Sequence, residues 1–304
     1  MTRPTSSYKI DLHVHSGASD GVGDLFDLLD AARARSIHVI AVTDHDALAT
    51  AVQAYAYLHH LSLTKDESSP RAIPGIEISS KIAQEDGSID VIHMLGLGID
   101  PFCRGLTELC AQRDVARMKE LTRRINHVRS MGYELSLQAE ARVRKAFWGR
   151  GELCRELVLS GRFDSVDEAY HAVWDHYPRE SGTEEHVSAQ DAIAAIHDAG
   201  GLAVLAHPLR DEISRGFIAR DAALRRIDGL VAMGLDGIEA WYRSFSQDEC
   251  RWFEEVAVSR GLLTSCGSDH HDFSRRFHLG KTCADADGTN TPEHASILAA
   301  LGVL

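Results

Sequence analysis

Two histidines separated by one residue stand near the start of the chain, in the segment Asp11-Leu12-His13-Val14-His15. On a β-strand, side chains at positions i and i+2 lie on the same face, so His13 and His15 can point in the same direction there. The apolar residues before and between them fit the end of a buried strand. Two imidazoles side by side form half of a metal site, which makes a metal-dependent hydrolase the leading interpretation.

Further histidines and carboxylates stand at or near the ends of other short β-rich runs. The carboxyl ends of parallel barrel strands converge on the active site, so residues far apart in the sequence can meet there. Glu77 lies in an apolar run, and a carboxylate is rarely buried without a cation or an arginine beside it. Taken singly, each candidate has an ordinary alternative, such as a hydrogen-bonded core histidine for His93 or a plain loop for 267–271. The candidates from this pattern are His13, His15, His45, Glu77, His93, His207, Asp269 and His271.

The composition limits the class of protein. The chain has 304 residues, a hydrophobic share of 44% and a formal net charge of −13. Such an acidic chain is unsuited to general nucleic-acid binding, which needs clustered Lys and Arg, but bound cations can still attract a small anionic substrate. The six cysteines form no Cys-x-x-Cys pair, which indicates free thiols in a reducing compartment. We find no signal peptide and no apolar run of membrane-spanning length, and we therefore expect a cytoplasmic protein.

Strand and helix patterns alternate over the first hundred residues and again after residue 187, which favours a parallel sheet with right-handed crossovers. Strands are expected over Lys9–Val14, Ile37–Thr43, Ala72–Ile78, Asp90–Leu97, Leu202–Ala206, Gly237–Ala240 and Leu262–Cys266. Helices are expected over Asp24–Arg35, Ala47–His60, Thr107–Met131, Glu152–Ser160, Val166–Asp175, Ala189–Ala199, Arg220–Met233 and Gln247–Arg260. Ser188 is a plausible N-cap. Residues 101–187 look helical, so we expect a barrel domain of residues 1–100 and 188–304 with a helical insertion of residues 101–187.

The candidate motifs resemble, in order along the chain, those of the PHP (polymerase and histidinol phosphatase) family of metal-dependent phosphoesterases. They are His13-Val14-His15, Thr43-Asp44-His45, Glu77, His93, His207-Pro208 and Gly267-Ser268-Asp269-His270-His271. The resemblance covers about residues 1–100 and 188–275. It implies an α/β fold, a distorted seven-stranded, TIM-like (β/α) barrel. The helical insertion is similar to that of the branch that hydrolyses nucleotide monophosphates and nucleoside 3′,5′-bisphosphates, where it would form a substrate-binding subdomain.

The resemblance also implies a trinuclear metal centre, in which two to three divalent or transition metal ions would be bound. Zn, Mn and Fe are all compatible with these ligands. His13, His15, Glu77 and Asp269 would hold the first ion, Glu77, His93 and His207 the second, and Asp20, His45 and His271 the third. His270 occupies a variable position and is not assigned. Asp44 and Asp46 would either orient imidazoles or cap the helix expected from Ala47.

Such a centre would suit phosphate-ester hydrolysis. Three divalent cations, three carboxylates and one hydroxide leave a net charge of about +2, which attracts a phosphate dianion. We expect hydroxide bridging the first two ions to attack phosphorus in line, while the third ion neutralises a non-bridging oxygen. His207 or Asp269 would protonate the leaving ribose oxygen.

Arginine binds phosphate through two oxygens at once, and three arginines, Arg150, Arg155 and Arg210, are candidates for this role. Arg210 follows the His207-Pro208 motif, and Arg150 matches the arginine that opens the insertion motif of relatives. This chain reads Gly-Arg-Gly-Glu over 149–152 where relatives commonly read Gly-Arg-Pro-His, so Glu152 replaces an imidazole expected to face the substrate. The aromatic residues that either stack on a base or belong to the core are Phe147, Trp148, Tyr177 and Trp241.

The sequence therefore predicts a metal-dependent phosphoric monoester hydrolase acting on AMP or a nucleoside 3′,5′-bisphosphate, with neither a nucleic-acid polymer nor a membrane as partner. The alternatives are another phosphomonoester such as histidinol phosphate, amide hydrolysis by a similar metal cluster, and a PHP module without catalysis.

Overall fold

A computed structural model describes residues 9–66, 68–83, 89–145, 149–175, 177, 186–211, 216–271, 279–284 and 295–302. The chain divides into two compact units. The barrel unit comprises residues 1–110 and 187–304, and the helical unit comprises residues 111–186.

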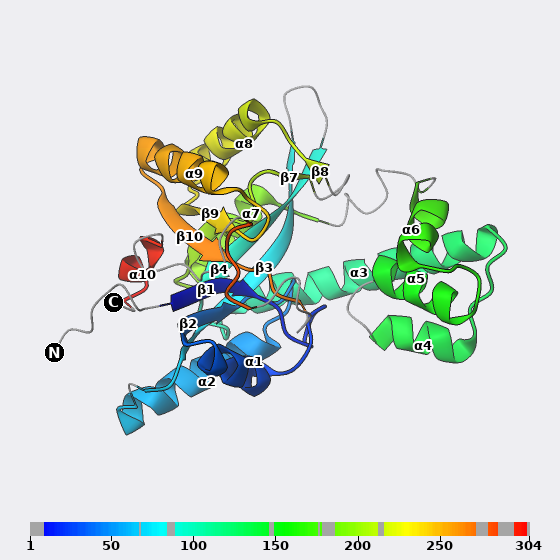
Figure 1. The fold of residues 1–304 in the computed structure, drawn as a ribbon, viewed down its shortest axis with the longest axis horizontal. Helices are drawn as coiled ribbons and strands as arrows, with labels where there is room; N and C mark the ends of the chain where they lie inside the picture. Colours follow the sequence, from blue (N-terminus) through cyan, green and yellow to red (C-terminus); the bar gives the residue numbers. More distant parts are fainter. Residues whose placement is uncertain are drawn as a thin grey trace. The chain divides into compact units, whose positions relative to one another are not determined.

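The barrel unit is built on a nearly closed, barrel-shaped sheet (Figure 1). Its strands, in spatial order, are β1 (Lys9–Val14), β2 (Ile37–Val42), β3 (Arg71–Ala83), β4 (Ile89–Leu97), β6 (Leu202–Leu205), β9 (Gly237–Tyr242) and β10 (Leu263–Gly267). β5 (Val187–Ser188) pairs with β3, and β7 (Arg210–Asp211) pairs with β8 (Gly216–Phe217) in a separate ribbon. Just beyond β1 and β10, the His15 amide donates to the His270 carbonyl over 2.9 Å, which brings the two edges of the sheet together.

One strand runs against the predicted direction. β4 is antiparallel to both of its neighbours, β3 and β6. A parallel pair needs a crossover of about a dozen residues or more, and the segment between Ala83 and Ile89 is too short for one. The sequence prediction was wrong here because β3 continues for five residues past its predicted end at Ile78, up to Ala83. Glu77 and His93 consequently lie inside long strands rather than at carboxyl ends.

Helices pack against the outside of this sheet, with α1 and α2 beside β2 and β3 and with α9 beside β9 and β10 (Figure 1). The helices of the unit are α1 (Leu25–Ala34), α2 (Ala49–Thr64), α7 (Ala189–Asp198), α8 (Arg220–Ala232), α9 (Gln247–Arg260) and α10 (Ile297–Ala300). Ser188 caps α7 as predicted, since its side chain accepts the Asp191 amide over 3.1 Å. Ser246 and Glu249 form a capping box at α9, which fixes where that helix begins.

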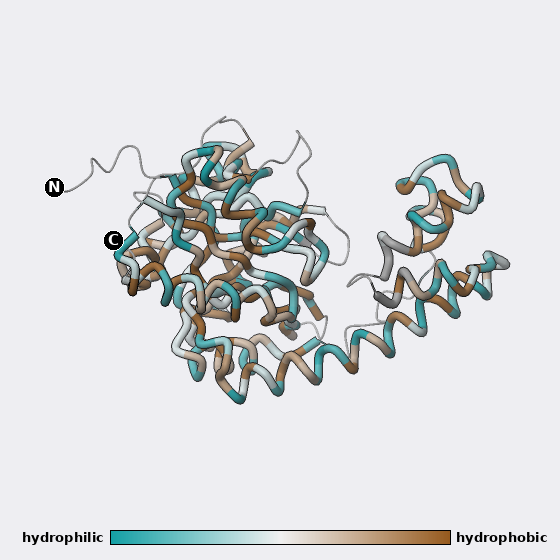
Figure 2. Tube along the Cα trace, turned by 90° about the horizontal axis from the view of Figure 1, so that it is seen from below, coloured by the Kyte–Doolittle hydropathy of each residue, from teal (hydrophilic) through white to brown (hydrophobic). Residues whose placement is uncertain are grey.

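Apolar side chains of the strands fill the interior of the barrel unit, where the trace is mostly brown in Figure 2. Leu12, Ile76, Met94 and Ile238 are all fully buried and come from four different strands. They pack with the inner faces of the surrounding helices. Each of them is next in sequence to a polar residue of the site, and adjacent strand residues point to opposite faces, so the apolar side chains face away from the polar ones.

The helical unit has a core of its own. The long helix α3 (Arg104–Ser130) begins in the barrel unit, and the helical unit continues with α4 (Leu137–Lys145), α5 (Gly149–Leu159) and α6 (Val166–Trp174). The sequence prediction missed α4. Ile125, Leu153, Leu157 and Val173 are fully buried in this core. The expected role of the insertion in substrate binding stays a prediction. In the described residues no helix is long and apolar enough to cross a membrane, and the cytoplasmic location stays a prediction too.

Candidate metal centre

The predicted ligands come together around one carboxylate in the barrel unit. Glu77 is fully buried in β3. Its Oε2 atom lies 3.2 Å from each of three ring nitrogens, those of His13 Nε2, His15 Nε2 and His45 Nδ1. Its other oxygen, Oε1, lies 2.9 Å from His93 Nδ1 and 3.2 Å from His207 Nε2. Five imidazoles from four separate parts of the sequence thus surround a single acid.

All nine predicted ligands belong to groups whose donor atoms lie within 4.8 Å of one another. The groups are His15, Asp20, His45 and His271; His13, Glu77 and His207; His13, His15 and Asp269; and His45, Glu77 and His93. Glu77 belongs to two of them, which fits a bridging carboxylate. The grouping differs from the family pattern in three respects. His15 also lies with the ligands expected for the third ion, His207 lies with His13 and Glu77, and His45 also lies with Glu77 and His93.

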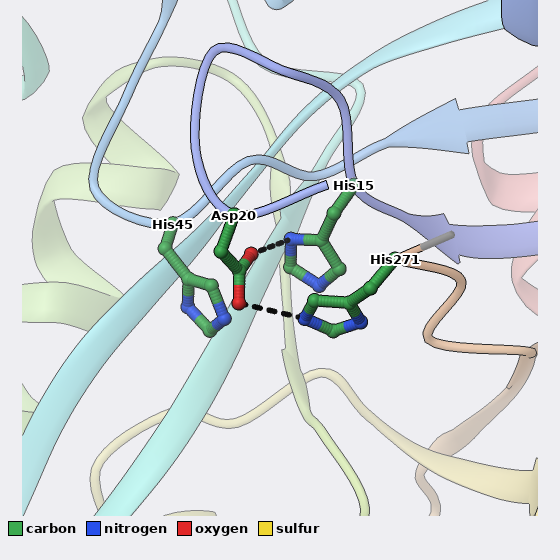
Figure 3. Close-up of side chains that lie close together, drawn as sticks. All are labelled: His15, Asp20, His45 and His271. Carbon is green, nitrogen blue, oxygen red and sulfur yellow. Dashed lines mark ion pairs between the residues drawn. The ribbon is translucent and has the colours of Figure 1, made fainter. Parts of the chain in front are cut away.

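Figure 3 shows one of these groups, formed by His15, Asp20, His45 and His271. Asp20 Oδ2 lies 2.9 Å from His271 Nε2, and Asp20 Oδ1 lies 3.6 Å from His15 Nδ1. The His15 ring stacks between the rings of His45 and His271, with centroid distances of 4.5 and 4.3 Å. Three histidines from different ends of the chain therefore face one aspartate.

Asp269 is held from outside by two residues that the sequence did not single out. Its Oδ1 atom lies 3.2 Å from His15 Nε2 and so faces the cluster. Its Oδ2 atom accepts the Tyr242 hydroxyl over 2.8 Å and lies 2.9 Å from Arg243 Nη2. Arg243 also donates to the Asp269 carbonyl. Asp269 and His207 have φ values of 49° and 31°, a region that non-glycine residues enter mainly at constrained sites.

A hydrogen bond behind His13 determines which of its nitrogens faces the cluster. Nδ1 lies 3.0 Å from Glu239 Oε1, and an ionised carboxylate only accepts, so Nδ1 carries the proton. When His13 is neutral, the lone pair of Nε2 points at Glu77 Oε2 and at His15 Nε2, each 3.2 Å away. Such electron pairs repel one another unless a proton or a cation lies among them. The donor set therefore fits divalent cations, with Glu239 fixing the orientation of the imidazole.

The same logic applies to His271, whose Nδ1 donates to the Asp269 carbonyl over 2.8 Å and leaves Nε2 to face Asp20. Glu239 also accepts the His207 amide over 2.7 Å. The sequence carried a signal for it, because Glu239 is an acid in the apolar run 237–242, as Glu77 is in its own run. No sequence signal pointed to Tyr242 or Arg243.

The buried acids and imidazoles perturb one another strongly. Burial raises the pKa of Glu77, but His45 and His13 lower it well below its usual range. Burial lowers the pKa of His15, but hydrogen bonds to Asp269 and Glu77 raise it to about 10. Burial lowers the pKa of His45 well below its usual range. Carboxylates that draw protons onto His15 will draw cations in the same way, because both neutralise the same negative charge.

Of the predicted substrate-binding residues, the structure describes the side chain of Arg210 and not those of Arg150 and Glu152. Arg210 lies in β7 and donates from Nη1 to the Tyr242 hydroxyl over 3.2 Å, so it stands beside the residues that hold Asp269. Arg150 and Glu152 lie in α5, and their side chains are outside the described residues. Residues 147 and 148 also lie outside them.

Two of the aromatic residues belong to cores, which argues against base stacking by them. Tyr177 is buried in the helical unit and donates to Glu120 over 3.0 Å. Trp241 is buried in the barrel unit and donates to Glu254 over 2.7 Å.

The two aspartates that flank His45 do not cap a helix. α2 begins at Ala49, after Leu48, and has no side-chain cap hydrogen bond. Asp46 accepts the Ser79 amide over 3.1 Å and so ties its loop to β3. Asp44 accepts hydrogen bonds from Ser16 and Ser19 and so ties its loop to the segment after β1.

Comparison with known proteins agrees with this geometry. The PHP domain family matches residues 11–181. A 3′,5′-nucleoside bisphosphate phosphatase of Chromobacterium violaceum is 32% identical over 280 residues, which cover 86% of this chain and 87% of the relative. A phosphoribosyl 1,2-cyclic phosphate 1,2-diphosphodiesterase of Eggerthella lenta is 27% identical over 281 residues (89% and 97% covered). A 5′-3′ exoribonuclease of Haemophilus influenzae is 27% identical over 273 residues (90% and 93% covered).

Among solved structures, a Chromobacterium violaceum protein described as an amidohydrolase, with bound sulfate, aligns with a TM-score of 0.71 at 27% identity, over 90% of this chain and 93% of its own. The fold and the ligand cluster, together with these relatives, define a metal-dependent hydrolase that acts on phosphate esters. The chain belongs to the PHP family, as the match over more than half of its residues shows.

Proposed function

We propose that this phosphoesterase removes a phosphate group from a small nucleotide, with AMP or a nucleoside 3′,5′-bisphosphate as its substrate, at a centre of up to three divalent cations. The observation that carries the proposal is the convergence of nine ligand residues into overlapping groups that share Glu77. Support for the nucleotide comes from the relative at 32% identity, which is named for a nucleoside bisphosphate.

In this proposal the side chains of the chain divide the work. Bound divalent cations would activate water and neutralise charge on the phosphate oxygens. Arg210 contacts the Tyr242 hydroxyl and Arg243 contacts the Asp269 carboxylate, so both guanidinium groups lie beside the cluster, where they can bind phosphate oxygens. Glu239 fixes the His13 orientation before substrate arrives, so this ligand needs no rearrangement during the reaction.

Proton transfer to the leaving oxygen is assigned to His207 or Asp269. Oδ2 of Asp269 is already engaged by Tyr242 and Arg243, and His207 Nε2 faces Glu77 among the proposed cation ligands, so the identity of the leaving-group acid stays a prediction. Arg150 and Glu152 stay predicted substrate contacts.

A second candidate is release of mononucleotides from an RNA end, because similar proteins include a 5′-3′ exoribonuclease and a cyclic-phosphate diphosphodiesterase. The net charge of −13 weighs against a long polyanion as substrate.

The test is a product screen on Mn²⁺-loaded protein. The substrates are adenosine 3′,5′-bisphosphate, 3′-AMP, 5′-AMP, histidinol phosphate and a short 5′-phosphorylated RNA. We expect inorganic phosphate from a mononucleotide and little nucleotide from RNA. Nucleotide release from RNA without free phosphate would select the second candidate.

His15→Ala serves as the matched inactive control, because His15 contacts Glu77, Asp269 and Asp20 at once. We expect it to fold and to lose turnover. Full turnover by this variant would contradict its proposed place among the cation ligands.

A further inference from the structure

Asp20 is a proposed ligand whose position depends on a loop. It lies five residues after His15, on the segment between β1 and α1, and its side chain is 22% exposed. Glu77 and His93 are fixed by a ladder of strand pairs, and His13 lies within β1. The loop that carries Asp20 needs contacts of its own to hold the carboxylate opposite His271.

Asp44 supplies those contacts. Its Oδ1 atom accepts the Ser16 amide over 2.8 Å and the Ser19 hydroxyl over 2.6 Å. Its Oδ2 atom accepts the Ser16 hydroxyl over 2.7 Å, and Ser16 Oγ lies 2.8 Å from Thr50 Oγ1. Asp44 and Ser16 are each 1% exposed, so these bonds to an anionic acceptor are shielded from water.

These bonds join the parts that make the group in Figure 3. Asp44 directly precedes His45, and Ser19 directly precedes Asp20. The loop is also folded tightly back on β1, because a Cβ at Gly21 would collide with the His15 backbone. One buried aspartate therefore sets the spacing between the His45 and Asp20 ligands.

We propose that Asp44 is a positioning residue for the third cation, the one held by Asp20, His45 and His271, and that its removal weakens that cation selectively. The proposal rests on the proposed metal centre. Loss of hydrogen-bonding partners of this kind costs about 10–100-fold in metal affinity. Glu77 and His93 lie inside strands, and the Glu77 amide donates to the Asp44 carbonyl, which a side-chain substitution leaves in place, so the other cations are retained.

The experiment measures cation binding directly. The wild-type chain, Asp44→Ala and Asp44→Asn are equilibrated with chelator-buffered Mn²⁺ and analysed for Mn per chain. We expect Asp44→Ala to bind one Mn²⁺ about 10–100-fold more weakly and the others as in wild type. Asp44→Asn should be nearly normal, because its amide oxygen can still accept the Ser16 amide and the Ser19 hydroxyl while its NH₂ donates to Ser16 Oγ.

Asp66→Ala is a matched control. Asp66 accepts the Ser68 amide, the Ser68 hydroxyl and the Ser69 hydroxyl in the same manner, over 2.7–2.8 Å, in the segment between α2 and β3. We expect its Mn²⁺ binding to be unchanged. Ser19→Ala removes the 2.6 Å bond to Asp44 together with two longer contacts, to Asp20 Oδ1 and His15 Nδ1, both at 3.5 Å. We expect it to lower the Mn²⁺ affinity by less than Asp44→Ala, and it provides a second test if Asp44→Ala does not fold.

Several results would overturn the proposal: unchanged Mn²⁺ affinity in Asp44→Ala and Ser19→Ala, a parallel loss of every cation, or a wild-type chain that saturates with two. Excess Mn²⁺ should restore turnover of Asp44→Ala with KM unchanged. Wild-type protein that binds three Mn²⁺ but hydrolyses no phosphate ester would refute the proposed function and leave the role of Asp44 intact.

Discussion

Replacing Glu239 with glutamine should weaken cation binding although the side chain keeps its size. Glu239 is fully buried and accepts from two donors, His13 Nδ1 over 3.0 Å and the His207 amide over 2.7 Å. A glutamine has one acceptor oxygen and one NH₂ group. If the oxygen serves the His207 amide, the NH₂ forces the proton of His13 onto Nε2, and the lone pair that faces the cluster is lost. If the oxygen accepts the proton of His13 Nδ1, the NH₂ group of the glutamine faces the backbone N–H of His207, and neither donor has an acceptor.

Either arrangement has a cost of similar size. An unsatisfied buried donor costs about 1–3 kcal/mol. Mutation of a residue that orients a metal-ligating histidine costs about 10–100-fold in affinity. A 10–100-fold loss corresponds to about 1.4–2.7 kcal/mol, so the two estimates agree. We therefore expect Glu239→Gln to bind Mn²⁺ about 10–100-fold more weakly.

The assay is competition between the protein and a chelator for Mn²⁺, combined with turnover at saturating Mn²⁺. Glu254→Gln is the matched control, because Glu254 accepts the Trp241 indole N–H over 2.7 Å and an amide oxygen can accept it equally well. Unchanged Mn²⁺ affinity in Glu239→Gln, with the control also unchanged, would show that the His13 tautomer does not control the site.

Three further predictions follow from buried contacts. Gly267→Ala would place a methyl group against the His13 side chain. It should lower the free energy of unfolding, measured by thermal unfolding, by about 1–3 kcal/mol and lower the number of cations bound per chain. Gly105→Ala, in open space on α3, should show neither effect. Since neighbouring carboxylates raise the pKa of His15 to about 10, protons compete with cations, and Mn²⁺ affinity measured by chelator competition should fall as pH falls; a flat profile would refute this. Burial raises the pKa of Glu120, but two arginines and a tyrosine hydroxyl lower it by more, so the pKa in the folded protein lies below the ordinary value of 4.5. The ionised Glu120 side chain therefore stabilises the folded state above pH 4.5, and this stabilisation is lost as the pH falls through the pKa of the folded protein. The melting temperature of wild type should exceed that of Glu120→Gln at neutral pH and approach it in acid.

Local patterns were sufficient for much of the fold. The strand predicted over Lys9–Val14 and the helix predicted over Gln247–Arg260 are observed with those bounds, because side-chain period and capping residues act within a few positions. The direction of β4 was wrong because the polar residues 79–81, which extend β3, hid the end of that strand.

The sequence by itself determined which residue types are available as ligands: several imidazoles and acids stand in apolar runs, where a buried acid needs a cation or a hydrogen-bond donor beside it. Only the tertiary structure decided how they are held. His13 meets Glu239 across 226 positions of the chain, Tyr242 and Arg243 close on Asp269, and Asp44 reaches back to Ser16 and Ser19. Such contacts depend on strand register and loop direction, which arise when distant segments pack together and leave no periodic trace in the residues that take part.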